Sequence, residues 1–384
     1  MRLLIAGGGT GGHIYPALAV ARSLGDRPNA PDLVWLGGQR GLEASLVRGA
    51  RIPVRRLVVR SLRSVDMSVH TVLDPLRLAA SVPQAAAILA RERPAAIFTT
   101  GGYVAVPTLI AAAPLRIPIV LWDGNVVPGR AVRLTARLVD AIAVAHDATG
   151  RALAGAGKPW YLTGTPIRDT TAIARTAARE RLDLPADARV ILIFGGSQAV
   201  TRFNTAVAEA LPRIVERGHV IHVSGEAAYA EALAARERLA PELRSRYRPF
   251  PFLRDDMLAA LVAADLVVGR AGSSTLAEVT ALGIPSVIVP YPHAAGHQLA
   301  NARVLAGAGA ARLVADEDFD ADALMAAADL LAEEGTLAAM SVAARSLGRP
   351  GAADAVAELV MAAAERRPFP DAARIEAISR GLAT

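Results

Sequence analysis

Residues 3–21, LLIAGGGTGGHIYPALAVA, decide the expected fold because an apolar run, a glycine cluster and a helical pattern follow one another directly. The run from Leu3 to Ala6 is typical of a buried strand, and the pattern from about Ile14 is typical of a helix packed against it. The glycines between them let the backbone approach an anion closely, and amides at a helix start stabilise negative charge. The stretch therefore predicts a strand, an anion-binding loop and a helix.

Short apolar runs of the same kind recur along the chain, separated by helical stretches. Such runs are typical of parallel strands joined by crossover helices. Two consecutive series predict an α/β fold with two doubly wound Rossmann-like parallel-sheet domains facing across a cleft. The further runs are 33–36, 54–59, 95–99, 117–121 and 141–145 in the first series, and 190–194, 220–223, 266–268, 285–289 and 311–314 in the second.

Glycines and prolines cluster at residues 158–166, so the join between the domains is expected there. We predict a first domain over 1–162 and a second over 163–365. The second domain would end in closing helices at about 336–347 and 352–364. Residues 366–384 show little periodicity and are expected to form a mobile tail.

Composition excludes several classes of protein. The chain has 384 residues, is 53% apolar and 20% charged, and is therefore folded and long enough for two domains. Because it contains no cysteine, it has no disulfides, thiolate zinc sites or cysteine nucleophiles. The first apolar run is too short for an export signal, and prolines interrupt residues 103–122, so we expect no transmembrane segment.

Positive charge is concentrated in the first domain. Residues 1–162 carry 19 basic and 9 acidic side chains, whereas the remainder carries 23 and 27. This asymmetry predicts an anionic partner, unless it is only the surface of an arginine-rich protein. At 4% aromatic residues there are few stacking platforms, so we expect no nucleic-acid partner. The densest basic run is Arg48, Arg51, Arg55, Arg56, Arg60 and Arg63, followed by Val72, Leu73, Leu76 and Arg77.

Three glycine loops follow predicted strands. The first fits the dinucleotide fingerprint G-x-G-x-x-G at Gly7, Gly9 and Gly12, but the second strand ends in Gly37, Gly38 and Gln39 without the acid that a nicotinamide cofactor needs. One glycine pair alone indicates only a tight turn. Together with Gly101–Gly102 and Gly195–Gly196, they predict a site that receives phosphates.

The second domain offers a further set of polar residues in GRAGSSTLAEV, residues 269–279. Ser273, Ser274 and Thr275 are N-cap candidates. Glu278 can accept two hydrogen bonds from a ribose, or it can be a capping-box partner. His293 and His297 have metal-like spacing but no evident third ligand, so we expect no metal and no cofactor.

The combined motifs resemble the MurG family of GT-B glycosyltransferases. The matching words are GGGTGGHIYPALAVA, TTGGYVAVP, LTGTPIR, FGGSQ, FLRDDM, GRAGSSTLAEV and YPHAAGHQLANA, in family order from Leu3 to about Ala311. The resemblance implies inverting transfer of GlcNAc from UDP-GlcNAc to the MurNAc 4-hydroxyl of undecaprenyl-pyrophosphoryl-MurNAc-pentapeptide (lipid I). It also implies peripheral attachment to an anionic membrane surface at the cytoplasmic face. We expect this attachment to be through the basic run at 48–63, unless that run is only a solvated strand and loop. The resemblance leaves other cell-wall synthesis proteins open as partners.

The resemblance assigns the substrate-binding residues by position. In the second domain, Ser197 and Arg168 would hold the diphosphate, the backbone at Leu253 and Arg254 the uracil, and Glu278 the ribose. In the first domain, Thr10, Gly11, Gly12 and Asn125 would border the sugar and the acceptor diphosphate. The remaining candidates are Gly101, Gly102, Gln198, Ser273, Ser274, Thr275, Leu276 and Ala277 around the phosphates and nucleotide, with Gln298 and Asn301 at the GlcNAc.

Two residues are candidates for the base that removes the acceptor proton. His13 comes first because imidazole titrates near neutral pH, and Asp123 second; His13 could instead only orient the acceptor diphosphate. The chain departs from the family at Asp123, where the acid is usually longer, and at Thr165 and Ala199. The alternatives are a UDP-GlcNAc 2-epimerase, another GT-B lipid glycosyltransferase, and a regulatory protein that binds a nucleotide sugar without turnover.

Overall fold

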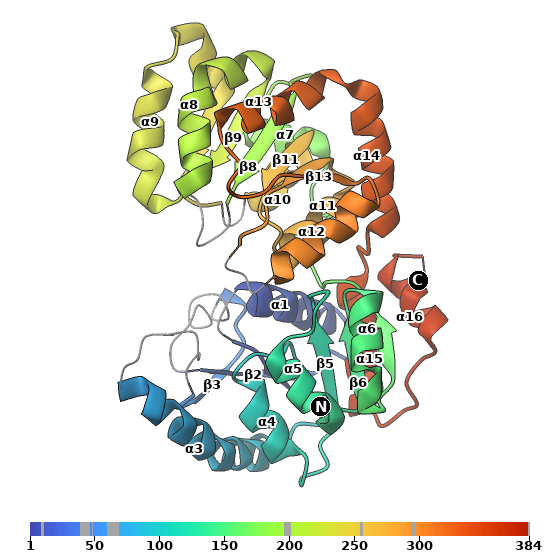
Figure 1. Cartoon of the computed structure of the whole chain (residues 1–384). Helices are drawn as coiled ribbons and strands as arrows, with labels where there is room; N and C mark the ends of the chain where they lie inside the picture. The colour runs from blue at the N-terminus through green and yellow to red at the C-terminus, as the bar shows by residue number, and fades with distance from the viewer. Residues whose placement is uncertain are drawn as a thin grey trace. The chain divides into compact units, whose positions relative to one another are not determined.

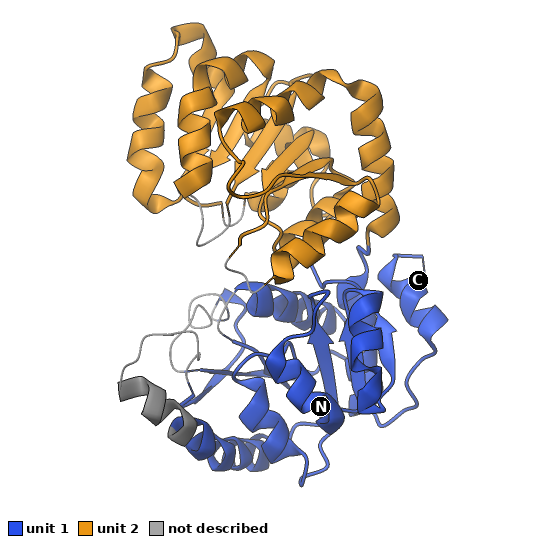
Figure 2. Cartoon of the chain, viewed as in Figure 1, with its two compact units in different colours: residues 1–168, 349–384 blue, residues 169–348 orange. Residues whose placement is uncertain are grey.

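The computed structural model describes residues 1–8, 11–38, 47, 49–59, 69–195, 201–253, 256–292 and 296–382, and for 69–76 the backbone alone. The chain divides into two compact units (Figure 2). Unit 1 comprises residues 1–168 and 349–384, and unit 2 comprises 169–348. Among the described residues, each unit contains one sheet in which all neighbouring strands are parallel.

In unit 1 the described strands form a seven-stranded sheet in the order β3-β2-β1-β4-β5-β6-β7 (Figure 1). The strands are β1 (Arg2–Ala6), β2 (Asp32–Gly38), β3 (Val54–Leu57), β4 (Ala96–Thr99), β5 (Ile119–Asp123), β6 (Ala141–Val144) and β7 (Trp160–Leu162). The helices are α1 (Gly11–Gly25), α3 (Val69–Glu92), α4 (Ala105–Ala112), α5 (Arg130–Thr135), α6 (Asp147–Leu153), α15 (Ala352–Ala364) and α16 (Ala372–Ser379), with the 3₁₀ turns η1 (Ala136–Leu138) and η2 (Ala154–Ala156).

In unit 2 the described strands form a six-stranded sheet in the order β10-β9-β8-β11-β12-β13. The strands are β8 (Val190–Phe194), β9 (His219–Val223), β10 (Tyr247–Phe250), β11 (Leu266–Gly269), β12 (Ser286–Ile288) and β13 (Ala311–Leu313). The helices are α7 (Arg175–Arg181), α8 (Thr201–Arg217), α9 (Tyr229–Glu237), α10 (Met257–Ala263), α11 (Ser273–Leu282), α12 (His297–Gly307), α13 (Ala321–Asp329) and α14 (Glu334–Leu347), with η3 (Glu226–Ala228), η4 (Pro241–Arg246) and η5 (Leu330–Ala332).

Each sheet reverses its strand order at one point. In unit 1 the reversal lies between β1 and β4, and in unit 2 between β8 and β11. Ligands of doubly wound sheets bind beyond the carboxyl ends of the strands at such a reversal. The loops that leave these four strands are the three glycine loops of the sequence and the loop before Ser273, so the topology brings them together in pairs.

The predicted fold class is confirmed, since every strand expected from the sequence is present. Two strands were not predicted, β7 and β10. Both lie at an edge of their sheet, where one side has no neighbour and a strand needs no continuous apolar run. β10 even contains Pro249, which an edge strand tolerates because one of its sides has no ladder hydrogen bonds to lose.

The C-terminal segment differs from the predicted domain boundaries. α15 was expected to close the second domain, but it packs against α1, β4 and β5 and contributes to the core of unit 1. The expected mobile tail contains α16, which packs on α15 and β7 and has Ile375 fully buried. The physical reason is that α15 has apolar residues on most of its circumference and needs a sheet face to cover them.

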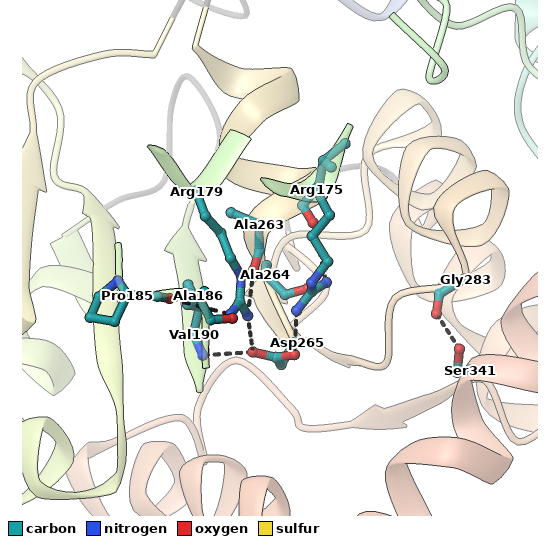
Figure 3. A network of polar contacts seen from close by, with 11 residues as sticks. Arg175, Arg179, Pro185, Ala186, Val190, Ala263, Ala264, Asp265, Gly283 and Ser341 are labelled. Carbon is teal, nitrogen blue, oxygen red and sulfur yellow. Dashed lines mark hydrogen bonds and ion pairs between the residues drawn. The ribbon is translucent and has the colours of Figure 1, made fainter. Parts of the chain in front are cut away.

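A polar network lies at the amino ends of β8 and β11 in unit 2, opposite the carboxyl ends from which the switch-point loops leave (Figure 3). Asp265 accepts hydrogen bonds from Val190 N (2.8 Å) and from Arg179 (3.1 Å) and Arg175 (2.5 Å). The Arg179 guanidinium is buried and also donates to the carbonyl oxygens of Pro185, Ala186 and Ala263. This network lies away from the switch-point loops and serves stability.

Candidate functional site

Two threonines join the glycine loops of unit 1. Thr99 Oγ1 donates to the carbonyl oxygen of Ala6 (2.8 Å) and accepts from Gly101 N (3.1 Å), so it ties the end of β1 to the loop after β4. Thr100 Oγ1 donates to the carbonyl oxygen of His13 (3.1 Å). Gly101 and Gly102 have φ of +79° and +78°, which side-chain-bearing residues rarely adopt, so the tight turn requires glycine at both positions.

His13 has a defined tautomer. Its Nδ1 donates to the carbonyl oxygen of Thr100 (2.8 Å), and because a carbonyl can only accept, Nδ1 carries the proton. In the neutral ring, Nε2 is then the nitrogen with the lone pair. A Cβ atom on Gly102 would lie 3.6 Å from this Nε2, in ordinary van der Waals contact, so the glycine loop after β4 lies beside the ring.

Asp123 is a buried carboxylate at the end of β5. Its Oδ1 accepts from Asn125 N (3.0 Å) and Nδ2 (3.4 Å), and its Oδ2 accepts from Gly129 N (3.2 Å). Burial raises the pKa of Asp123, while these hydrogen bonds and the nearby His13 lower it in part. Both oxygens therefore shape the 124–129 loop, and Asn125 is held further by Thr149 Oγ1, which donates to its carbonyl oxygen (2.6 Å).

The switch-point loop that follows β11 leads directly into the N-terminus of α11. Its N-cap is Gly272, which provides no side-chain cap. The expectation that Ser273, Ser274 or Thr275 is the N-cap is therefore corrected: the three lie in the first turn of the helix. Ser274 Oγ is buried and has no hydrogen-bond partner among the described residues, although a buried hydroxyl nearly always has one. A ligand oxygen at this helix start would supply it.

Glu278 lies one turn further along α11 and is 7% exposed. With Gly272 as N-cap, the capping-box position is residue 275, so the capping-box alternative for Glu278 is excluded. Leu276 packs in the core of unit 2, and Ala277 is half-buried. Of these three residues, Glu278 alone carries a polar side chain for a ligand.

Gln298 and Asn301 lie one turn apart on α12 but in different surroundings. Gln298 is half-buried, and its Oε1 accepts from Tyr291 N (2.9 Å). Asn301 is 1% exposed. Gln298 is the better placed of the two for a sugar hydroxyl because its side chain is more exposed.

The remaining predicted residues fall into three groups. Gly11 and Gly12 form the first turn of α1, which begins before the predicted Ile14. Arg168, expected in the second domain, is half-buried in unit 1, and Leu253 is part of the core of unit 2. Thr10, Ser197, Gln198, Ala199, Arg254 and His293 lie outside the described residues.

Sequence reasoning missed the residues that position the site. Thr99, Thr100 and Thr149 act through backbone atoms distant in sequence, and Trp35 donates from Nε1 to the carbonyl oxygen of Gly7 (2.9 Å). The one available signal was the TT preceding GG at residues 99–102. Within the described part of the chain, no three histidine or acidic side chains are grouped to hold a metal.

Comparison with known proteins gives the family. The N-terminal domain of glycosyltransferase family 28 matches residues 3–144 and its C-terminal domain matches 190–358. A UDP-N-acetylglucosamine–N-acetylmuramyl-(pentapeptide) pyrophosphoryl-undecaprenol N-acetylglucosamine transferase of Corynebacterium diphtheriae is 38% identical over 94% of this chain and 96% of its own length. The crystal structure of Acinetobacter baumannii MurG has a TM-score of 0.71 and is 26% identical, over 94% of this chain and 99% of that one.

The fold also occurs with other activities. A Listeria monocytogenes protein described as a UDP-N-acetylglucosamine 2-epimerase has a TM-score of 0.67 over 96% of this chain and 98% of its own. At 16% identity this likeness concerns the fold alone. The 38% identity along nearly the whole chain and the two matching domains decide the family. The chain therefore belongs to glycosyltransferase family 28 and, within it, to the UDP-N-acetylglucosamine–N-acetylmuramyl-(pentapeptide) pyrophosphoryl-undecaprenol N-acetylglucosamine transferases.

Proposed function

We propose that this protein transfers GlcNAc from UDP-GlcNAc to the 4-hydroxyl of MurNAc in lipid I, with inversion at the anomeric carbon, giving lipid II and UDP. Unit 2 binds the donor through α11 and Gln298. Unit 1 binds the acceptor through the loops after β1, β4 and β5. The observation that supports this assignment most strongly is the tautomer of His13, which presents Nε2 as a proton acceptor beside a glycine loop.

The reaction is a single displacement. Nε2 of His13 takes the proton of the acceptor 4-hydroxyl while the oxygen of that hydroxyl bonds to the anomeric carbon of GlcNAc. The bond from that carbon to the β-phosphate oxygen breaks, and UDP leaves with the electron pair. The amides at the start of α11 stabilise its diphosphate, with Arg168 and Ser197 as the further phosphate ligands.

UDP release distinguishes the candidate reactions. With UDP-GlcNAc alone, the transferase releases little UDP, and a lipid I analogue is expected to increase the release strongly. Conversion of UDP-GlcNAc to UDP-ManNAc without an acceptor would identify an epimerase instead. Binding of UDP-GlcNAc without either reaction would indicate a regulatory protein.

Glu278 is the proposed ribose ligand. Glu278→Ala is expected to weaken UDP binding about 10- to 100-fold, because hydrogen bonds to a charged group contribute ~1.5–3 kcal/mol each. Isothermal titration calorimetry measures this loss. The control ligand is uridine diphosphate without ribose hydroxyls, to which wild type and variant should bind equally. Unchanged affinity of the variant for UDP would refute the role of Glu278.

We further propose that unit 1 attaches to an anionic membrane surface, since the acceptor is lipid-borne. No described helix is both long and apolar enough to cross a bilayer. Of the basic run, Arg48, Arg60 and Arg63 lie outside the described residues, and Arg55 is paired with Glu92 at 2.7 Å. The described surface adds a second basic and apolar area on α5 and η1.

This α5 face consists of Arg130, Arg133, Leu134, Arg137 and Leu138, all exposed and spaced as one side of a helix. Leu134 is 76% exposed, and none of the three arginines is ion-paired with a described residue. Arg116 and Leu138 line one hollow, so the loop before β5 extends the face. Unpaired arginines around exposed leucines suit anionic lipid headgroups over an acyl layer.

A substitution in the α5 face is expected to weaken lipid binding. Leu134→Glu is expected to weaken binding to vesicles containing anionic lipid about tenfold or more, since it removes an inserting side chain and adds negative charge. Vesicle co-sedimentation at low salt measures the loss. Val342→Glu, at a 67% exposed position of unit 2, is the matched control and should bind as wild type. Equal wild-type binding to neutral and anionic vesicles would contradict the proposal.

A further inference from the structure

A buried arginine, Arg270, joins the loop after β11 to the segments that follow β12 and β13 in unit 2. It directly follows β11 and is 6% exposed. Its Nη1 donates to the carbonyl oxygens of Val289 (3.2 Å) and Pro290 (3.5 Å) and pairs with the carboxylate of Asp316. A buried guanidinium requires such partners because an unpaired cation is costly to desolvate. Its polar contacts therefore fix the chain before α11 to the chain after β12.

Two aromatic rings lie close to the Arg270 guanidinium. Cζ of Arg270 lies 4.8 Å from the ring centroid of Phe203 and 5.4 Å from that of Tyr291, within the range of cation–π attraction. Phe203 belongs to the first turn of α8. Asp316 follows β13 and also contacts Nε of Arg202 on α8 at 3.3 Å. Arg270 and Asp316 thus connect α8, the 289–291 segment and the segment after β13.

Both donor-binding elements are attached to this pair. Ser273, the first residue of α11, is three residues after Arg270 in the chain. Tyr291, which contacts the Arg270 guanidinium, also donates its N–H to Oε1 of Gln298. A change at Arg270 is therefore transmitted along the chain to α11 and through Tyr291 to Gln298.

We propose that the Arg270–Asp316 pair is a positioning element for the nucleotide-sugar donor. It sets the separation between the start of α11 and Gln298 and does not itself contact the donor. The inference rests on the proposed donor site in unit 2. The two possible roles of Arg270 predict different effects of removing the Asp316 charge. If the pair positions the donor site, the change weakens donor binding. If Arg270 binds a phosphate directly, the change leaves its guanidinium more available and does not weaken donor binding.

The test is Asp316→Asn, which keeps the size of the side chain and removes its charge. The KM for UDP-GlcNAc and the Kd for UDP are expected to rise about tenfold, whereas kcat and the acceptor KM should stay within about twofold of the wild-type values. Arg270→Lys should give the same split, and the double variant should be no worse than the weaker-binding single variant because both act through one contact. Asp322→Asn is the matched control, since Asp322 pairs with Arg213 on the exposed side of α8.

Two outcomes overturn the proposal. If Asp316→Asn lowers the urea midpoint but leaves UDP affinity unchanged, the pair is only structural. If Arg270→Lys weakens UDP binding and Asp316→Asn does not, Arg270 contacts the donor directly. Calorimetry with UDP requires no acceptor, so a wild-type chain that binds UDP but transfers no GlcNAc contradicts the proposed function alone.

Discussion

Replacing His13 by glutamine is expected to lower kcat about 1,000-fold, within the usual contribution of a general base. Glutamine occupies similar space and has an amide that can donate to the Thr100 carbonyl oxygen, as Nδ1 of His13 does. It has no group that accepts a proton near neutral pH. Because the proposed donor contacts of α11 and Gln298 belong to unit 2 and His13 belongs to unit 1, the KM for UDP-GlcNAc should stay within about threefold of wild type. UDP release at saturating lipid I analogue measures both constants.

The second candidate for the base provides the comparison for this variant. Asp123→Asn tests the second candidate. Since both Asp123 oxygens accept amide hydrogens from the 125–129 loop, this change should mainly raise the acceptor KM. A His13→Gln variant with more than about one tenth of wild-type kcat would refute His13 as the base.

The central strands and glycine loops were predictable because their signals are local. A buried parallel strand is a continuous apolar run, and the loop that follows it is marked by glycine, as at Leu3–Ala6 and Gly7. The edge strand β10, YRPF, lacks that run because one of its sides has no neighbour. The central strands and their glycine loops therefore follow from the sequence, whereas the edge strands β7 and β10 do not.

The positioning of the site could not be predicted because it depends on contacts between distant residues. His13 and Thr100 are 87 residues apart, and only the strand order β1-β4 brings them together. Likewise, the helical pattern of α15 predicts a helix but not which sheet it covers. The N-cap of α11 was misassigned because three hydroxyl residues follow Gly272, whose backbone conformation alone caps the helix.

Replacing Asp265 by alanine is expected to destabilise unit 2 by about 3 kcal/mol, the cost of leaving a buried charge without its partner. Among the described residues, Arg179, with 7% of its side chain exposed, would retain only carbonyl oxygens as acceptors (Figure 3). Val190 N would also lose its acceptor at the start of β8. Urea unfolding of the full chain, followed by far-UV circular dichroism, measures the loss. Tryptophan fluorescence follows unit 1 separately, since Trp35, Trp122 and Trp160 all lie there.

Removing Arg179 should destabilise unit 2 less than removing Asp265. Arg179→Met leaves Asp265 paired with Arg175 at 2.5 Å and with its side chain 28% exposed, so it should cost at least about 1 kcal/mol less than Asp265→Ala. The double variant should cost less than the sum of the two because they remove one shared contact. Asp322→Ala breaks a pair in which the aspartate is 83% exposed, and should cost under about 1 kcal/mol. An Asp265→Ala variant as stable as Asp322→Ala would show that the buried network does not stabilise the sheet.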